Sequence, residues 1–407
     1  MPDHDLAARL RASLARQEQR LRSSLILNPV ENVPFGADLA VIAGPLHGLY
    51  NTDKVRTRSA RLATPIQFAD RQALERDTRA IYDAWAEALH AADVTLRLLS
   101  GLHAHIVLFM AAARPGDTVL MLPTEAGGHV SGKAIAERLG LNVLDMVVDY
   151  EAMCIDVDRT LALCACEQPD FIWVDRSEGL TFEDFSALGA VEGPLTMFDA
   201  SQYLSNIICG DHPNPFSWGF DLMAATVHKN FPGPQKALLA SRSVDERWTR
   251  ILSGISIYVS NMHSASIYAA GLTLARRDWL AGYSRRMLEL AVSLEAELLA
   301  RGVPAVKRRD DWPPTHHVWI REDGRDRAFA TYEALERCLI LTNFRQLPYS
   351  LGYGIRLGVS AAANIGLLHE DVPELADLIA DIRRRGPTPE LQRRAKAFNE
   401  MIWARRE

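Results

Sequence analysis

Lys229 lies in a sequence context that could make its amine reactive. It follows the apolar run 222–225, within the segment Thr226-Val227-His228-Lys229, and a turn rich in Pro and Gly comes next. Because a buried ammonium is costly, a lysine that leaves a buried strand is rarely there for packing. Spacing leaves two interpretations open: a solvated loop lysine, or an amine desolvated enough to form a Schiff base.

A carboxylate occupies a matching position upstream. Asp199 directly follows the apolar run 195–198, and strand ends line ligand sites in open α/β sheets. There a carboxylate can keep a pyridine nitrogen protonated, which makes a cofactor ring an electron sink. A helix N-cap is the alternative role for Asp199.

Two further segments suit a phosphorylated, flat ligand. Ser100-Gly101 lies between an expected strand and a helix, where a hydroxyl and free backbone N–H groups can cradle a phosphate. His103 and His105 lie just inside that helix and are further candidates to touch the phosphate. In Gly127-Gly128-His129 the glycines allow a close backbone approach, and the imidazole can stack on a flat ring.

The elements that must position these residues alternate along the chain. Apolar runs predict strands at 94–98, 118–122, 141–147, 171–174, 195–198, 222–225 and 237–240, with helices at 68–90, 101–113 and 131–139 between several of them. This alternation favours a mostly parallel sheet covered on both faces. A helix at 3–24, an irregular stretch at 25–64, a long helical segment at about 262–301, and a mixed tail complete the prediction. That tail has strands at 317–320 and 354–357 and a helix near 371–385. We expect a helix and arm at 1–45, a large domain at 46–270 and a small one at 271–407.

Composition excludes several classes of protein. Of 407 residues, 48% are hydrophobic and 24% charged, the balance of a globular chain. The net charge of −6, without a basic cluster, argues against nucleic-acid binding. Five cysteines without CxxC spacing predict reduced thiols and no metal site. No apolar run approaches a membrane span, so we expect a cytoplasmic protein without a membrane partner.

Taken together, these motifs resemble fold-type-I pyridoxal-phosphate enzymes and, more narrowly, the serine hydroxymethyltransferase family. The matching segments extend from about residue 25 to 365: Asn28-Pro29-Val30-Glu31-Asn32, Ala126-Gly127-Gly128-His129, Asp211-His212-Pro213-Asn214-Pro215, Thr226-Val227-His228-Lys229, Thr315-His316-His317-Val318 and Gly354-Ile355-Arg356-Leu357-Gly358. The resemblance implies an aspartate-aminotransferase-like fold, with a large mostly parallel-sheet domain and a smaller C-terminal α+β domain.

The resemblance also implies a role for each matching residue. Lys229 would form the internal aldimine with pyridoxal 5′-phosphate, Asp199 would hold the pyridine nitrogen, and His129 would stack on the ring. Arg356 would clamp the amino-acid carboxylate. The remaining cofactor contacts would come from Ser100, Gly101 and His228 at the phosphate, Thr226 at the ring hydroxyl, and Ser177 near the ring. Tyr50 matches a tyrosine that the family lends to the neighbouring subunit's phosphate site, which implies a homodimer with composite active sites.

The departures from the family concern folate and proton transfer. The family's Tyr-Ala-Glu-Gly-Tyr-Pro-Gly segment reads Tyr50-Asn51-Thr52-Asp53-Lys54-Val55 here, so its glutamate is missing and Asp53 lies one position off. Gln202 and Gln235 replace a histidine and an arginine, Val30 replaces a serine, and residues 253–258 replace a Gly-Gly-Pro segment. These losses favour a folate-independent, aldol-type transfer like that of the L-threonine transaldolases. A glycyl quinonoid, formed from a small β-hydroxy amino acid, would be added to an aldehyde, in amino-acid or secondary metabolism.

Other reactions remain open on the same scaffold. Serine or α-methylserine hydroxymethyl transfer, racemisation and β-elimination all need the same lysine, aspartate and arginine. A degenerate, non-enzymatic relative is disfavoured because Lys229, Asp199 and Arg356 are all present.

Overall fold

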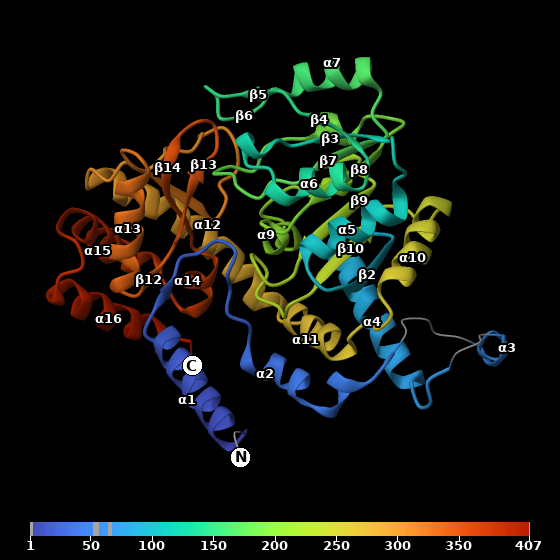
Figure 1. The fold of residues 1–407 in the computed structure, drawn as a ribbon, viewed down its shortest axis with the longest axis horizontal. Coiled ribbons are helices and arrows are strands. Elements are labelled where there is room, and N and C mark those ends of the chain that lie inside the picture. The colour runs from blue at the N-terminus through green and yellow to red at the C-terminus, as the bar shows by residue number, and fades with distance from the viewer. Residues whose placement is uncertain (1–2, 52–56, 64–66, 407) are drawn as a thin grey trace.

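A seven-stranded sheet forms the centre of the computed structural model, which describes residues 3–51, 57–63 and 67–406 (Figure 1). Its order is β2-β10-β9-β8-β7-β3-β4. The strands are β2 (Asp93–Leu98), β3 (Thr118–Met121), β4 (Asn142–Asp145), β7 (Phe171–Val174), β8 (Leu195–Asp199), β9 (Leu222–Thr226) and β10 (Ala237–Ser241). The pairs from β9 to β4 are parallel, and β10 runs antiparallel to both of its neighbours. The predicted mostly parallel α/β sheet is therefore confirmed.

The strands are apolar because both faces of the sheet are buried. Along β7, Phe171 and Trp173 pack into one core, while Ile172 and Val174 pack into the other. Period-two alternation between two buried faces explains why each strand is a continuous apolar run. Helices α5 (Gly101–Ala112) and α10 (Glu246–Tyr258) cover the first face. Helices α4 (Gln72–Leu89), α9 (Leu204–Cys209) and part of α12 (Arg277–Ala300) cover the second.

Short helices and a hairpin connect the remaining strands of this part. They are α6 (Val130–Arg138), α7 (Val157–Glu167), α8 (Ser186–Gly189), and the antiparallel pair β5 (Val148–Asp149) and β6 (Cys154–Ile155). The Ser100 hydroxyl caps α5 by accepting a hydrogen bond from the His103 amide at 3.2 Å. Such a cap fixes where the helix begins and so where its free N–H groups point.

The predicted helix over 262–301 is wrong as a single element. The structure has α11 (Ser264–Leu274) followed by α12, and the break falls at Ala275 and Arg276. The backbone of Arg276 leaves the helical region, and its guanidinium binds the buried carboxylate of Asp38 at 2.7 and 3.0 Å. This ion pair accompanies the turn between the two helices.

A second, antiparallel sheet lies in the C-terminal part, in the order β11-β14-β13. It consists of β11 (His317–Arg321), β13 (Asn343–Leu347) and β14 (Gly352–Gly358), and its helices are α13 (Arg325–Arg337), α14 (Ser360–Ile365), α15 (Val372–Arg385) and α16 (Pro389–Trp403). The strands predicted at 317–320 and 354–357 and the helix near 371–385 are confirmed.

The N-terminal segment contacts both the C-terminal part of the chain and a loop of the central sheet. After α1 (Asp3–Arg22), β1 (Leu25–Ile26) pairs in parallel with β12 (Ile340–Leu341). The stretch predicted as irregular then contains the short helices α2 (Gly36–Leu39) and α3 (Arg58–Leu62). Within it, the Asn32 amide donates a hydrogen bond to the backbone oxygen of Lys229 at 2.6 Å. The loop that carries the lysine is thus held from the far end of the chain.

Candidate active site

The predicted site residues meet at the carboxyl ends of the parallel strands. A cavity opens there, and its empty space of about 280 Å³ includes solvent at its mouth. It is lined by Gly101, Leu102, His105, His129, Asp175, Arg176, Ser177, Asp199, Ser201, Gln202, Thr226 and Lys229. Two larger hollows, of about 930 and 690 Å³, lie at the opposite ends of the strands around Arg247 and contain none of the predicted residues. The strand-end location is the one expected for ligands of open α/β sheets.

Gly101 and Thr226 form a tight corner of this cavity. The Gly101 amide donates a hydrogen bond to the Thr226 hydroxyl at 3.1 Å. A Cβ atom on Gly101 would lie 2.4 Å from that same oxygen, so a side chain does not fit there. Ser201, which the sequence analysis missed, accepts a hydrogen bond from the Thr226 amide at 2.8 Å. The corner therefore brings a helix N-terminus to the end of β9.

Lys229 lines the cavity three residues beyond β9. Burial lowers the pKa of its amine, the carboxylates of Asp199 and Asp175 act in the opposite direction, and Arg356 lowers it further. A second lysine, Lys236, is fully buried nearby but donates to the backbone oxygen of Met262 at 2.7 Å and does not line the cavity. Of the two interpretations left open for Lys229, the structure supports the desolvated amine.

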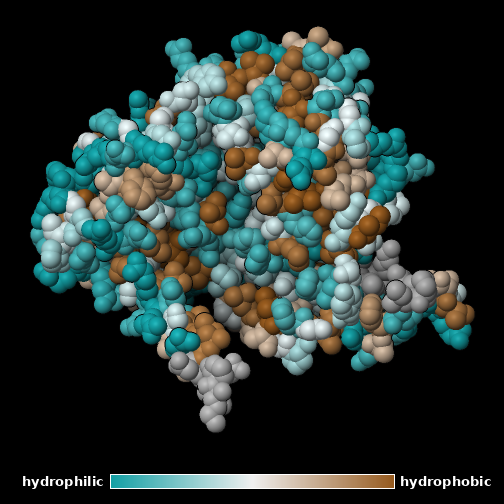
Figure 2. Space-filling model, in the orientation of Figure 1, coloured by the Kyte–Doolittle hydropathy of each residue, from teal (hydrophilic) through white to brown (hydrophobic). Residues whose placement is uncertain are grey.

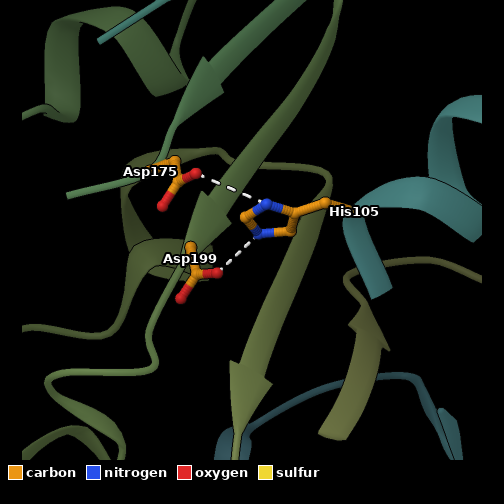
Figure 3. Close-up of side chains that lie close together, drawn as sticks. All are labelled: His105, Asp175 and Asp199. Carbon is orange, nitrogen blue, oxygen red and sulfur yellow. Dashed lines mark hydrogen bonds and ion pairs between the residues drawn. The ribbon is translucent and has the colours of Figure 1, made fainter. Parts of the chain in front are cut away.

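Three buried side chains form what we call the imidazole cluster: His105, Asp175 and Asp199 (Figure 3). His105 points from α5 into the space between the two carboxylates. Its Nε2 lies 2.6 Å from Asp199 Oδ2, and its Nδ1 lies 3.4 Å from Asp175 Oδ2. The other oxygen of Asp199 accepts a hydrogen bond from the Ser201 amide at 2.7 Å. Asp199 is not the N-cap of the following helix, whose N-cap is Tyr203.

The pKa values of the imidazole cluster shift in a connected way. Burial alone would lower the pKa of His105, but the two carboxylates raise it above its ordinary value. Burial would raise the pKa of Asp199, but the hydrogen bond and charge of His105 lower it. Burial raises the pKa of Asp175, which has the longer contact to His105. An imidazolium held mainly by Asp199 accounts for the first two directions, whereas burial and the charge of Asp199 outweigh it at Asp175, whose pKa rises to about 7.

The structure changes the interpretation of His105. We expected it near a phosphate at the start of α5, but it lies against Asp199 instead. One helical turn separates Gly101 from His105, so both residues face the sheet. Asp175 was missed, although it directly follows the apolar run 171–174 as Asp199 follows its own run. The strand-end rule applied to Asp199 would have found it.

His129 and Ser177 reach the cavity from loops. His129 is the N-cap of α6, and its Nδ1 accepts a hydrogen bond from the Ser131 amide at 3.2 Å. Its pKa is lowered to about 4, first by burial and then by His105 and Lys229, so its ring is neutral at neutral pH. The Ser177 amide binds the backbone oxygen of Gly127 at 2.8 Å, which joins the two loops.

Arg356 belongs to a second charged group, which we call the arginine cluster: Glu178, Arg345 and Arg356. Arg356 is buried in the middle of β14, and its Nη1 lies 3.5 Å from Glu178 Oε1. Arg345 on β13 contacts the same oxygen at 2.6 Å. Burial lowers the pKa of Arg356 to about 10. Its Nε and Nη1 atoms make no hydrogen bond within the described part of the chain. Arg356 does not line the cavity itself, but it lowers the pKa of Lys229.

The other predicted residues lie at or beyond the cavity's edge. Ser100 caps α5, and the Nδ1 of His228 accepts from the Lys236 amide at 3.4 Å. Tyr50 is exposed, with its hydroxyl 3.2 Å from that of Ser260, and it does not line this cavity. Asp53 lies outside the described residues. Gln202 does line the cavity, and its Oε1 accepts a hydrogen bond from His316 at 3.0 Å.

None of the described helices combines the length and the apolar character needed to cross a membrane.

Comparison with known proteins identifies the family. The family model for serine hydroxymethyltransferase matches residues 3–379. A fluorothreonine transaldolase of Streptantibioticus cattleyicolor is 33% identical over 299 residues, which are 72% of this chain but only 46% of that relative. A serine hydroxymethyltransferase of Pyrobaculum islandicum is 28% identical over 335 residues, covering 79% of this chain and 77% of that one.

The fold also has a close counterpart among solved structures. The L-threonine transaldolase from Pseudomonas fluorescens, in its internal aldimine state, matches with a TM-score of 0.91 and 20% identity over 98% of this chain and 92% of that one. This likeness shows the fold-type-I architecture. The extent of the family match and the strand-end cavity agree: the chain belongs to the serine hydroxymethyltransferase family.

Proposed function

We propose that this chain is a folate-independent transferase that moves the glycyl part of a small β-hydroxy amino acid, such as threonine, to an aldehyde. The observation that carries the proposal is the cavity in which Lys229, Asp199 and His129 meet at the strand ends. The name of the Streptantibioticus relative, a fluorothreonine transaldolase, supports the reaction class.

Pyridoxal 5′-phosphate is the cofactor of this family, and the described cavity fits it. The Gly101 corner leaves no room for a side chain, and it brings the N-terminus of α5, an end of a helix that favours anions, to the wall of the cavity. Lys229 is the cavity's lysine, and Asp199 is a buried, ionised carboxylate on another wall. These are the groups that a cofactor with an aldehyde, a basic ring nitrogen and a phosphate requires.

We assign the residue roles as follows. Lys229 would hold the cofactor covalently, Asp199 would pair with its ring nitrogen, and His129 would pack on its ring as a neutral imidazole. Arg356 binds the substrate carboxylate, a task that suits a planar guanidinium. The remaining assignments are Ser100, Gly101 and His228 to the phosphate, Thr226 to the ring hydroxyl, Ser177 to a position near the ring, and Tyr50 to the phosphate of a second copy.

The chain's own groups then orient the substrate and move its protons. The bound cofactor supplies an electron sink for negative charge at the substrate Cα. Asp199, whose pKa is lowered by His105, would leave the proton on the ring nitrogen of the bound cofactor. Lys229, whose pKa is lowered by burial, has a larger neutral fraction than an exposed lysine and can accept the proton of the substrate β-hydroxyl. By binding the carboxylate, Arg356 would fix the orientation of the substrate Cα, and with it which bond at Cα is placed to react.

We propose a homodimer in which Tyr50 serves the partner's site. The leucines of α1 support it: Leu10 and Leu14 are 60% and 59% exposed. Figure 2 shows hydrophobic side chains at the surface of this helix. A second copy would cover such a stripe, since exposed apolar rows usually mark contact surfaces.

We also propose the division into an N-terminal helix and arm (1–45), a large cofactor-binding domain (46–270) and a small domain (271–407). The two sheets support it, since every strand of the central sheet lies between residues 93 and 241 and every strand of the second sheet lies between 317 and 358.

A second candidate function is hydroxymethyl transfer from serine or α-methylserine, which the names of relatives such as the Pyrobaculum enzyme favour. One preparation tests both. The enzyme is incubated with L-threonine and a panel of aldehydes, and with serine or α-methylserine with and without tetrahydrofolate. Release of acetaldehyde together with a new β-hydroxy amino acid, unaffected by folate, supports the transaldolase. Folate-accelerated serine cleavage would make the chain a hydroxymethyltransferase, and a racemised or deaminated product would point to the other reactions of this scaffold.

A further inference from the structure

Asp175 is a second buried carboxylate in the cavity, with no role in the function proposed above. We propose that Asp175 and His105 are positioning residues that act through Asp199. Asp175 keeps His105 in its doubly protonated form, and His105 keeps Asp199 ionised and oriented toward the cofactor's ring nitrogen. The inference rests on the proposed cofactor site and extends it to two further residues.

The geometry places a carboxyl group opposite each ring nitrogen of His105. Its Nε2 lies 2.6 Å from Asp199 Oδ2, a distance that requires a hydrogen between the two atoms. Its Nδ1 faces Asp175 Oδ2 at 3.4 Å. A neutral imidazole has a proton on only one nitrogen, so the other would present a lone pair to a carboxylate. With both carboxyl groups ionised, only the imidazolium presents an N–H to each of them.

The surroundings hold the ring in this place. His105 and Trp173 form a T-shaped contact, with ring centroids 5.2 Å apart and planes at 89°. His129 meets the ring of His105 at 6.2 Å and 81°. The titratable groups that face His105 are Asp175, Asp199, Lys229 and His129, and of these Lys229 opposes its protonation. Since the whole ring is buried, water does not screen these charges.

Asp175 matters because the bound cofactor would add a positive charge to the imidazole cluster. A protonated ring nitrogen beside Asp199 would place two cations on one buried carboxylate, the pyridinium and the imidazolium. A buried charge is tolerated when it is paired. Asp175 supplies the second negative charge, so two carboxylates balance two cations. Without it, His105 would lose its proton more easily, Asp199 would become more basic, and the ring nitrogen would share its proton with Asp199.

The test compares Asp175→Asn and His105→Gln with the wild type. Asp158→Asn is the control, because it makes the same chemical change at an exposed position in the first turn of α7. The cofactor–lysine linkage is first reduced with borohydride, so that the linkage itself no longer titrates. The absorption of the bound cofactor is then followed from pH 5 to 10, together with the KM for the amino acid in unreduced enzyme.

We expect the absorption midpoint of Asp175→Asn to lie at least about one pH unit below that of the wild type, because a charge at this distance shifts a pKa by about 1–3 units. His105→Gln keeps an N–H donor for Asp199, but glutamine cannot titrate. The absorption of the cofactor in this variant should therefore show no midpoint between pH 5 and 10. The double variant should behave like His105→Gln alone. The KM for the amino acid should stay within about threefold in Asp175→Asn, since Arg356 is untouched.

Three results would overturn the inference: a wild-type midpoint in Asp175→Asn, the same shift in Asp158→Asn, or additive effects in the double variant. The cofactor content of the wild type separates this failure from a failure of the proposed function. A wild type that binds no pyridoxal phosphate refutes the proposed function, whereas a loaded wild type with an unresponsive Asp175→Asn refutes the positioning role alone.

Discussion

The imidazole cluster and the arginine cluster are opposite in charge. In the first, one imidazole lies between the carboxylates of Asp175 and Asp199. In the second, the carboxylate of Glu178 lies between the guanidiniums of Arg345 and Arg356. Both acidic side chains of the first cluster and the carboxylate of the second are almost fully buried. Lys229 is affected by both clusters, since Asp175 and Asp199 raise its pKa and Arg356 lowers it.

The difference shows which charge each cluster still lacks. With all groups ionised, two carboxylates and one imidazolium leave one negative charge, whereas two guanidiniums and one carboxylate leave one positive charge. A protonated ring nitrogen would balance the first cluster, and a substrate carboxylate would balance the second. Under the proposed function, the counter-charge of the cofactor would lie on the central sheet and that of the substrate mainly on the C-terminal sheet.

Lys229→Ala should have the largest effect, because it removes the group that both clusters act upon. We expect loss of the covalent cofactor link and activity below detection. Borohydride reduction followed by peptide mass spectrometry measures the link. Lys236→Met is the matched control: it removes the other buried lysine, whose pKa is lowered to about 7 by burial. A reducible adduct that persists in Lys229→Ala and disappears in Lys236→Met would show that the lysine is misassigned.

Arg356→Ala should disable the substrate end alone. Truncating one partner of a buried charge pair costs about 2–5 kcal/mol, so we expect kcat/KM to fall about 30- to 5,000-fold, mainly through KM. The cofactor's absorption spectrum should remain that of the wild type. Arg345→Ala serves as the comparison: its side chain is 32% exposed against 4% for Arg356, so its effect should be smaller. Equal losses of kcat/KM in the two variants would contradict the assignment of the substrate carboxylate to Arg356.

Asp199→Asn should disable the cofactor end alone. A hydrogen bond to a charged group contributes about 1.5–3 kcal/mol, which corresponds to a kcat lower by about 10- to 150-fold. The KM for the amino acid should change little, because Arg356 is intact. Exchange of the substrate Cα hydrogen, followed by NMR in deuterated water, reports this step. Exchange at the wild-type rate would exclude Asp199 as the partner of the ring nitrogen.

The smallest expected effect is on how the stability of the fold depends on pH. It distinguishes His105, whose pKa is raised, from the buried histidines whose pKa is lowered. Burial lowers the pKa of His212 to about 4 from 6.5. Between these values the unfolded chain binds a proton that the folded chain does not, so His212 lowers stability as the pH falls from 6.5 toward 4. His105 acts in the opposite direction, because its raised pKa stabilises the fold at low pH and this contribution is lost as the pH rises through it.

We therefore expect His212→Gln to flatten the fall of Tm between pH 6.5 and 5. The change should approach about 1.4 kcal/mol per pH unit in free energy. Glutamine can still donate to the backbone oxygen of Pro314, which His212 Nε2 contacts at 2.9 Å. Scanning calorimetry across this range measures it, and a slope unchanged from the wild type would mean that His212 does not contribute.

The sequence predicted the strands and the residues at their ends better than the contacts between elements. Continuous apolar runs mark strands buried on both faces, and parallel strands bring their carboxyl ends to one edge, which is why Asp199, Thr226 and Lys229 could be placed together. The orientation of His105 depends on the rotational phase of α5, which a helix apolar on most sides does not reveal. The pairing of Glu178 with Arg345 and Arg356 depends on how the second sheet docks on the first, and no local pattern encodes that.

The hydrogen bonds of Asn32 have a consequence for the order in which the protein is made. Asn32 binds the backbone oxygen of Lys229 and accepts a hydrogen bond from Asn364, which is 332 residues away along the chain. A ribosome adds about 5–20 residues per second, so this asparagine waits tens of seconds for its last partner. During that time the central sheet can fold and Asn32 can bind the loop of Lys229, but Asn32 itself is not yet held by Asn364. A nascent chain stalled before residue 364 would therefore hold the loop of Lys229 through an asparagine that still lacks its hydrogen bond from Asn364.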